Sequence, residues 1–202
     1  MKTWMKYANR IIILIIILTS IYAFFERLSI GSYDRIPVVL SCIPVLLAPY
    51  LIKVIFKYDM SLSLRFFYFI FAFLGLTLGS VLSFYTKISW FDLFVHALSG
   101  VFTAFLALIF LKRIGLVNNK NLWFQILFMI SFSLAIAGVW EIFEFVCDKI
   151  TKGDAQKVLE TGVSDTMEDM IIASVGAIVY SIIYIVLSKK NKKLKEKWLE
   201  LL

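Results

Sequence analysis

The chain has 202 residues, of which 61% are hydrophobic and only 17% are charged. A soluble domain averages about 45–50% apolar and about 25% charged residues, so this composition excludes a water-soluble globular fold. The 21 Lys and Arg residues outnumber the 14 Asp and Glu residues and give a net charge of +7. No basic nucleic-acid motif accompanies this charge, so we expect no nucleic-acid partner.

Six apolar segments are long enough to span a bilayer, which takes about 20 residues in a helix. They cover residues 7–25, 36–56, 66–85, 88–111, 122–147 and 166–187. The sequence therefore predicts an all-α fold: a polytopic bundle of six transmembrane helices that forms a single transmembrane domain over residues 1–202. No small-residue cleavage site follows the first segment, so we expect it to be a retained helix and not a signal peptide.

The second segment differs from the others because it contains Pro37, Pro44 and Pro49. A proline inside a helix removes one backbone hydrogen bond, so this segment is expected to be kinked or broken. Such a segment could serve as a gate or as a bent wall of the bundle.

The basic residues predict how the protein crosses the membrane. Of the 21 Lys and Arg residues, 15 fall on the side of the two termini and 6 on the other side, whereas 11 of the 14 acidic residues fall on that other side. By the positive-inside rule, both termini are cytoplasmic. The Lys-rich tail at 188–202 is then expected to bind anionic lipids of the inner leaflet, with Leu194 and Trp198 dipping into the interface.

Most acidic residues gather at one end of the last three segments, although charge inside a bilayer is costly and often marks function. In the fourth segment, residues spaced four apart share one helix face: Asp92, His96, Gly100 and Ala104. The fifth and sixth segments repeat the pattern with Ala137, Gly138, Glu141, Glu144 and Asp148, then with Asp165, Asp169, Ala173 and Ala177. Because small residues allow helices to approach closely in lipid, we expect these faces to pack together and their polar ends to form one outward-facing site.

One imidazole among several carboxylates suits a divalent metal ion, with Mg, Mn or Ca favoured by oxygen ligands and Zn or Fe compatible with the histidine. The expected metal ligands are Glu141, Glu144, Asp165, Asp169 and His96. His96, oriented by Asp92, is expected to act as a ligand or as a general base. The same groups could instead form a proton relay.

Simpler structural roles compete with this interpretation at several positions. Asp92 could cap its helix, and Asp165 with Glu168 fits a capping box. Asp148 could pair with Lys152, and His96 could be a hydrogen-bonded core residue. Glu141 and Glu144 have no such alternative, because the helix dipole disfavours acids near a helix C-terminus and a cation, proton or basic partner is needed to offset it.

Three motifs in the second half of the chain resemble the YjdF-like family of small multi-pass bacterial inner-membrane proteins, which have no assigned biochemical function. They are Phe91-Asp92-x-x-x-His96-x-x-x-Gly100, Trp140-Glu141-x-x-Glu144-Phe145 and Gly162-x-x-Asp165-Thr166-x-x-Asp169-Met170. The resemblance implies a bacterial cytoplasmic-membrane protein with a shared polar site. The Asp92-x-x-x-His96 piece is also similar to VanZ-like envelope proteins, with Leu93 where those proteins usually have lysine.

Three classes of function remain open on the sequence. The first is a metal-dependent hydrolase or transferase that acts on an envelope lipid or a lipid-linked phosphate. The second is a cation- or proton-coupled transporter, for which the inner halves of the helices offer few polar residues. The third is a structural or assembly protein whose acids satisfy one another, and assembly into a homo-oligomer is compatible with all three.

Overall fold

A computed structural model of the chain describes residues 2–33, 36–117, 121–154 and 156–190. Every regular element in these ranges is a helix, which confirms the all-α prediction. The Lys-rich tail lies outside the described residues except for its first positions. Backbone contacts divide the chain into two units, with the boundary after Asp92, and we describe each unit by itself.

The first unit contains the first three predicted spans. Its elements are α1 (Lys2–Ser29), α2 (Ile36–Leu40), α3 (Cys42–Phe56), α4 (Leu62–Ala72), the π-helix η2 (Phe73–Val81) and the short α5 (Phe84–Lys87). The helix α1 packs along α4 and η2 and also contacts α2 and α3. This unit holds none of the acids expected to form the site except Asp92 at its boundary.

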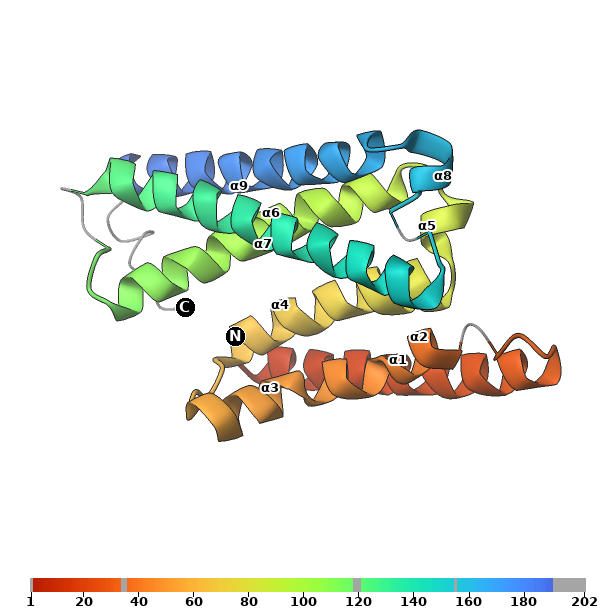
Figure 1. The fold of residues 1–202 in the computed structure, drawn as a ribbon. Coiled ribbons are helices and arrows are strands. Elements are labelled where there is room, and N and C mark those ends of the chain that lie inside the picture. The colour runs from red at the N-terminus through yellow and green to blue at the C-terminus, as the bar shows by residue number, and fades with distance from the viewer. Residues whose placement is uncertain (1, 34–35, 118–120, 155, 191–202) are drawn as a thin grey trace. The chain divides into compact units, whose positions relative to one another are not determined.

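The second unit is built from three long helices and one short one. They are α6 (Phe91–Arg113), α7 (Leu122–Thr151), α8 (Val158–Thr161) and α9 (Ser164–Lys190). The long helices α7 and α9 pack extensively against each other, and α8 lies in the connection between them (Figure 1). The helix α6 is continuous across the unit boundary, so Asp92 in its first turn is described together with this helix.

Within the described residues, six helical stretches are long and apolar enough to cross a membrane, which agrees with the six predicted spans. They are Thr3–Ser29, Ile36–Phe56, Leu62–Val81, Phe91–Arg113, Leu122–Thr151 and Ser164–Ser188. The third span begins four residues earlier than predicted because the Ser61 side chain accepts a hydrogen bond from the Leu64 N–H at 3.2 Å and caps the helix. It also ends earlier, because Ser83 adopts a left-handed conformation with φ 61°.

The proline-rich second span is broken as predicted, with α2 ending at Leu40 and α3 beginning at Cys42. Inside α3, Pro49 cannot donate the backbone hydrogen bond that the carbonyl of Val45 would receive in a regular helix. The Tyr68 hydroxyl of α4 donates to this carbonyl instead, at 2.7 Å. A side chain from the neighbouring span thus satisfies the carbonyl that the proline leaves without its helical partner.

We expect Tyr68→Phe to lower the free energy of unfolding by about 1–3 kcal/mol, because it leaves a buried carbonyl without its donor. Thermal unfolding in detergent measures this loss as a lower midpoint. Tyr50→Phe is the matched control, since Tyr50 lies on α3 with 67% of its surface exposed. Equal midpoints for the two variants would contradict this role of Tyr68.

The third span departs from α-helical geometry over its second half, where η2 forms a π-helix of nine residues. Its exit shows the wider hydrogen-bond spacing, with the Leu82 N–H donating to the Thr77 carbonyl at 3.0 Å. A Cβ atom on Gly79 would overlap the ring of Tyr85, so this glycine lets α5 fold back against η2. Gly79 therefore serves a turn within the unit and not a crossing between two spans.

The connection between α3 and α4 is held by charges. Asp59 forms ion pairs with Lys53, at 2.8 Å, and with Arg65. The hydrogen bond from Lys53 and the nearby Arg65 guanidinium hold the pKa of the Asp59 carboxyl below its ordinary value. In the unfolded chain the pKa of this carboxyl is near 4, and at pH values above it the carboxylate stabilises the folded state. This stabilisation is lost as the pH falls through the lower pKa of the folded state.

We expect Asp59→Asn to remove this acid-dependent part of stability. The wild-type unfolding midpoint should fall more steeply than that of the variant as the pH falls below about 4, because only the wild type protonates this carboxylate there. The measurement is thermal unfolding in detergent across this pH range. Parallel curves for the two proteins would contradict the contribution of Asp59.

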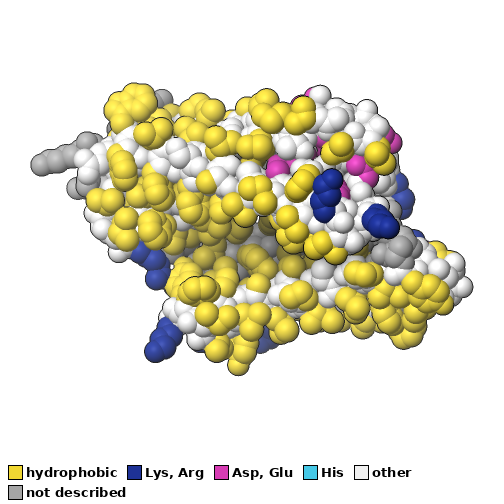
Figure 2. Space-filling view, viewed as in Figure 1, with side chains coloured by type: hydrophobic (Ala, Val, Ile, Leu, Met, Phe, Trp, Pro, Cys, Tyr) yellow, Lys and Arg dark blue, Asp and Glu magenta, His cyan; other side chains and the backbone are white. Residues whose placement is uncertain are grey.

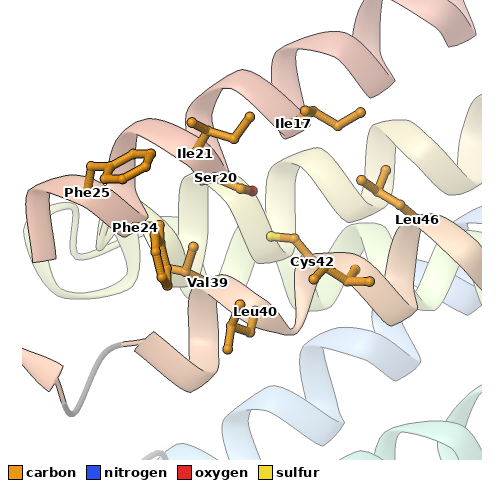
Figure 3. A pocket seen from close by; sticks show the side chains of 10 residues that line it. Ile17, Ser20, Ile21, Phe24, Phe25, Val39, Leu40, Cys42 and Leu46 are labelled. Carbon is orange, nitrogen blue, oxygen red and sulfur yellow. The ribbon is translucent and has the colours of Figure 1, made fainter. Parts of the chain in front are cut away.

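The core of the first unit lies between α1 and the broken second span. Ile16, Ala23, Val39 and Cys42 are buried there. Beside this core, residues of α1, α2 and α3 line an apolar crevice of about 250 Å³ (Figure 3). Both cysteines are free; Cys42 is buried and Cys147 is partly buried.

In the second unit, α6 and α9 cross at backbone contact. A Cβ atom on Gly100 would overlap the carbonyl oxygen of Ala173, and one on Gly176 would overlap the carbonyl oxygen of Ala97. The two glycines thus lie on opposite helices and each receives the backbone of the other helix. This is the close approach expected for the small-residue faces of these segments.

Polar side chains join the three long helices along the interior of the second unit. Thr103 of α6 donates to the Ser133 hydroxyl of α7 at 2.8 Å, and Tyr184 of α9 donates to the Gln125 side-chain oxygen of α7 at 2.5 Å. All four side chains are buried, with Gln125 at 0% exposure. Buried pairs of this kind fix which faces of the helices meet.

Candidate functional site

The crossing of α6 and α9 brings His96 next to Asp169. His96 lies one turn before Gly100, and Asp169 lies one turn before Ala173, so the backbone contact between Gly100 and Ala173 sets their separation. His96 Nε2 lies 3.5 Å from Asp169 Oδ2, and their side chains are only 12% and 5% exposed. The sequence pattern predicted that these two helix faces would meet.

Asp92 completes the group from the first turn of α6, one turn before His96 on the same face. One ligand atom from each of Asp92, His96 and Asp169 lies within 4.8 Å of the others. Two ligands that share an ion through bonds of about 2.1 Å are at most about 4.2 Å apart. The upper limit of 4.8 Å is thus slightly wider than the spacing of ligands that share one ion.

Two carboxylates and one imidazole form a donor set that suits Mn²⁺, Mg²⁺ or Zn²⁺. Without an ion, the same geometry lets a protonated His96 pair with the Asp169 carboxylate. This set of side chains is compatible with a bound cation or with a proton shared between His96 and Asp169.

Glu141 is buried on α7, with 5% of its surface exposed, and its partner is Gln156. The Gln156 side-chain nitrogen lies 3.3 Å from Glu141 Oε2 and 3.1 Å from the Glu141 carbonyl oxygen. The same nitrogen lies 3.2 Å from the Thr166 hydroxyl of α9. Glu141 is thus connected to α9 through a glutamine of the loop and is not part of the Asp92, His96 and Asp169 group.

The two other expected ligands also have partners of their own. Glu144 accepts a hydrogen bond from the Trp140 indole nitrogen at 2.9 Å, one turn away on α7. Asp165 accepts from the Lys157 ammonium at 3.1 Å. Of the five residues expected to bind metal, the structure brings together His96 and Asp169, and it adds Asp92, which was expected to orient His96.

Asp165 and Asp148 both contact the connection between α7 and α8. The helix α9 begins at Ser164, so Asp165 lies inside its first turn and pairs with Lys157 across the loop. Asp148 accepts from the Gln156 backbone N–H at 3.2 Å, and so fastens the loop to the end of α7. These two acids therefore contact Gln156 and Lys157, the two residues that precede α8.

In the space-filling view, acidic side chains gather near the end of the second unit that carries α8, with Lys or Arg side chains beside them (Figure 2). Much of the surrounding surface is hydrophobic, as expected for helices that face lipid. The acidic side chains visible in this view thus lie at one end of the second unit.

Sequence reasoning missed Gln156 and Gly176. Gln156 lies in a loop, where no helical periodicity indicates which side chain turns inward. Gly176 had a usable signal, because it stands between Ala173 and Ala177 on a face already rich in small residues.

Comparison with known proteins identifies the family of this chain but does not identify an activity. Residues 8–190 match a family described as predicted membrane protein (DUF2238). No curated protein and no solved structure matches the chain.

Proposed function

The chain belongs to the DUF2238 family of predicted membrane proteins, and we propose that it binds a divalent metal ion through Asp92, His96 and Asp169 and uses it in catalysis. The reaction is hydrolysis or transfer of a phosphate ester on an envelope lipid or a lipid-linked carrier. The observation that carries this proposal is the convergence of three ligand atoms within 4.8 Å at one end of a membrane helix bundle.

The chemistry of the surrounding residues supports a phosphate substrate. A divalent metal ion held by Asp92, His96 and Asp169 would supply Lewis-acid chemistry suited to a phosphoryl group. Basic residues beside the site, such as Lys157 with 31% of its side chain exposed, provide attraction for an anionic headgroup. The site lies near a helix end, where lipid headgroups lie in the membrane.

We also propose a membrane and an orientation for the protein. The charge asymmetry supports both termini in the cytoplasm, with the site on the outer side of the membrane. The YjdF-like resemblance supports a bacterial cytoplasmic membrane. The Lys-rich tail then binds anionic lipids of the inner leaflet.

An activity assay on reconstituted protein tests the proposal. Vesicles that contain polyprenyl diphosphate, phosphatidic acid or phosphatidylglycerol are incubated with the protein, and phosphate release and lipid products are measured by mass spectrometry. We expect the protein to turn over one of these lipid classes. This turnover should stop when EDTA is added and return with Mn²⁺ or Zn²⁺, and the Asp169→Asn variant should show none. No metal-dependent turnover of any class would overturn the enzymatic part of the proposal.

A second candidate, proton- or cation-coupled transport, is favoured by the buried polar side chains that continue along the bundle from His96. Thr103 with Ser133 and Gln125 with Tyr184 lie in the interior, and Ser181 is buried at 2% exposure. If the protein is a transporter, vesicles that contain it should show proton or cation flux across the membrane, which a pH-sensitive dye measures. The variant Ser133→Ala should reduce this flux. Flux without turnover would favour this candidate over the enzyme.

A further inference from the structure

One face of α1 carries a basic hollow at its first turns. The hollow has a volume of about 310 Å³ and is lined by Thr3, Lys6, Tyr7 and Arg10 of α1 and by Leu62, the first residue of α4. The four residues of α1 recur at spacings of three and four, so they lie on one helix face. All four are exposed. Their polar groups therefore border one space that a ligand can enter from outside.

The side chains around this hollow are donors that suit an anion. Lys6 and Arg10 supply two positive charges, and neither forms an ion pair within 4.0 Å in the part of the chain that the structure describes. The hydroxyl groups of Thr3 and Tyr7 add neutral donors, and none of the described residues that line the hollow is acidic. Ammonium and guanidinium groups both pair well with phosphate oxygens, so a phosphate group fits this donor set.

The position of the hollow favours a phosphate that belongs to a lipid. Its two walls are the first turns of two membrane spans, Thr3–Ser29 and Leu62–Val81. The ends of membrane spans lie at the depth of the lipid headgroups. Trp4, beside the hollow on α1, is 50% exposed, and tryptophan is enriched at this depth.

The same face of α1 leads from the basic hollow to the apolar crevice between α1, α2 and α3 (Figure 3). In steps of three and four residues, this face continues from Arg10 through Leu14 to Ile17 and Ile21. Ile17 and Ile21 line the crevice. Leu14, between the two hollows, is 54% exposed, so the helix surface that joins them is apolar and accessible at this residue.

The crevice suits a hydrocarbon chain. Its lining is hydrocarbon apart from Ser20 and Cys42, and the Ser20 hydroxyl already donates to the Ile16 carbonyl at 2.7 Å. Ile17 follows Arg10 by seven residues, which is about 10 Å along the helix. One leaflet contributes about 15 Å to the hydrocarbon core, so an acyl chain whose phosphate lies at Arg10 can reach the crevice.

We propose that this face of α1 binds one anionic phospholipid, with its phosphate against Lys6 and Arg10 and one acyl chain in the crevice at Ile17 and Ile21. The alignment of a basic hollow and an apolar crevice on one helix face carries this inference, because it matches the two parts of an amphiphile. The site lies entirely in the first unit, so the inference goes beyond the proposed metal chemistry of the second unit.

Photocrosslinking tests the proposal at the crevice itself. The protein is placed in nanodiscs of phosphatidylcholine that contain a small fraction of phosphatidylglycerol with a diazirine on its acyl chain. After illumination, labelled peptides are quantified by mass spectrometry, with the labelling of α7 as the measure of general lipid contact. We expect residues 17–25 and 39–46 to be labelled above α7 by this lipid, and no more than α7 by a phosphatidylcholine that carries the same diazirine. Equal labelling of the crevice by the two lipids would overturn the proposal.

Charge variants connect this labelling to the basic hollow. One basic residue near the membrane surface contributes about fivefold to the affinity for anionic lipid, so Lys6→Gln/Arg10→Gln should lower the crevice labelling at limiting phosphatidylglycerol by at least about 10-fold. Lys112→Gln/Arg113→Gln is the matched control, because it removes the same two charges from the end of α6. Its crevice labelling should stay near that of the wild type. Equal losses in the two variants, or no loss in the first, would overturn the proposal.

Competition distinguishes a lipid phosphate from a soluble one. Unlabelled phosphatidylglycerol should displace the photoreactive lipid from the crevice of the wild type, whereas inorganic phosphate at equal ionic strength should not. Displacement by inorganic phosphate as complete as that by phosphatidylglycerol would overturn the assignment to a lipid. Metal content and lipid turnover are measured separately, so the failure of either proposal is distinguishable from failure of the other.

Discussion

Replacing Gly100 with alanine is expected to disrupt the second unit strongly. The added Cβ would overlap the carbonyl oxygen of Ala173, with the Ala173 Cα atom 3.0 Å away. Backbone atoms cannot rotate aside as a side chain can, so α6 and α9 must separate. We expect a loss of more than about 3 kcal/mol, at or above the upper end of the usual cost of overpacking.

Gly138→Ala is the matched control, because it adds the same methyl group to a helical glycine of α7. Its nearest neighbour would be the flexible end of Met170 at 3.7 Å, an ordinary contact. Alanine is favoured over glycine inside a helix by about 1 kcal/mol, so this variant should be as stable as the wild type or more stable. Thermal unfolding in detergent compares the two. Similar midpoints would show that the backbone contact at Gly100 is not tight.

The separation of α6 and α9 has a functional consequence as well. His96 and Asp169 lie one turn from the Gly100 and Ala173 contact on their respective helices. A shift of the helices at the crossing therefore moves the two side chains apart. Gly100→Ala should weaken cation binding even under conditions in which the protein stays folded.

The second large effect is expected for Asp169→Asn, which should weaken Mn²⁺ binding by more than about 100-fold. Loss of a residue that only supports a metal ligand already costs about 10–100-fold in affinity. Asp169 is proposed as a direct ligand and is 3% exposed, so solvent offers little replacement for its charge. Titration of Mn²⁺ followed by electron paramagnetic resonance measures this affinity.

Asp165→Asn is the control for this measurement, because it removes an equal charge from the same helix one turn away. The Asp165 carboxylate pairs with Lys157 and lies outside the Asp92, His96 and Asp169 group. Its loss should leave Mn²⁺ affinity within a few-fold of the wild type. Equal losses for the two variants would indicate a general effect of negative charge and not a coordinated ion.

The fold was largely predictable because a bilayer permits few solutions. Backbone groups in hydrocarbon must bond within the segment, so apolar stretches of about 20 residues are helices. The break at Pro37 and Pro44 was predictable for the same reason, since proline lacks the donor that a helix needs. The π-helix of η2 was not predictable, because the sequence of Phe73–Val81 contains no proline or other signal that distinguishes π-helical from α-helical hydrogen bonds.

The candidate site was predictable in part. Spacing by four residues placed Asp92 and His96 on the face of Gly100, and Asp169 on the face of Ala173, so the crossing of the small residues brought these side chains together. Which acids share one group depends on helix rotation and on the loop, which local spacing does not determine.

Glu144 and Asp165 illustrate this limit. Glu144 lies only three residues from Glu141, yet the helix turns it toward the Trp140 indole. Asp165 lies one turn from Asp169, yet a lysine of the folded loop pairs with it. The helical periodicity of the sequence does not predict hydrogen-bond and ion-pair partners that lie in an irregular loop.

Metal content tests the central claim most directly. Protein purified in detergent, before and after incubation with Mn²⁺, Mg²⁺ or Zn²⁺ and removal of excess ion, is measured by elemental mass spectrometry beside a His96→Ala/Asp169→Asn variant. We predict close to one equivalent of a divalent metal in the wild type and none in the variant. A wild type that retains no metal under any of these conditions, or a variant that retains as much, would contradict a metal site at Asp92, His96 and Asp169.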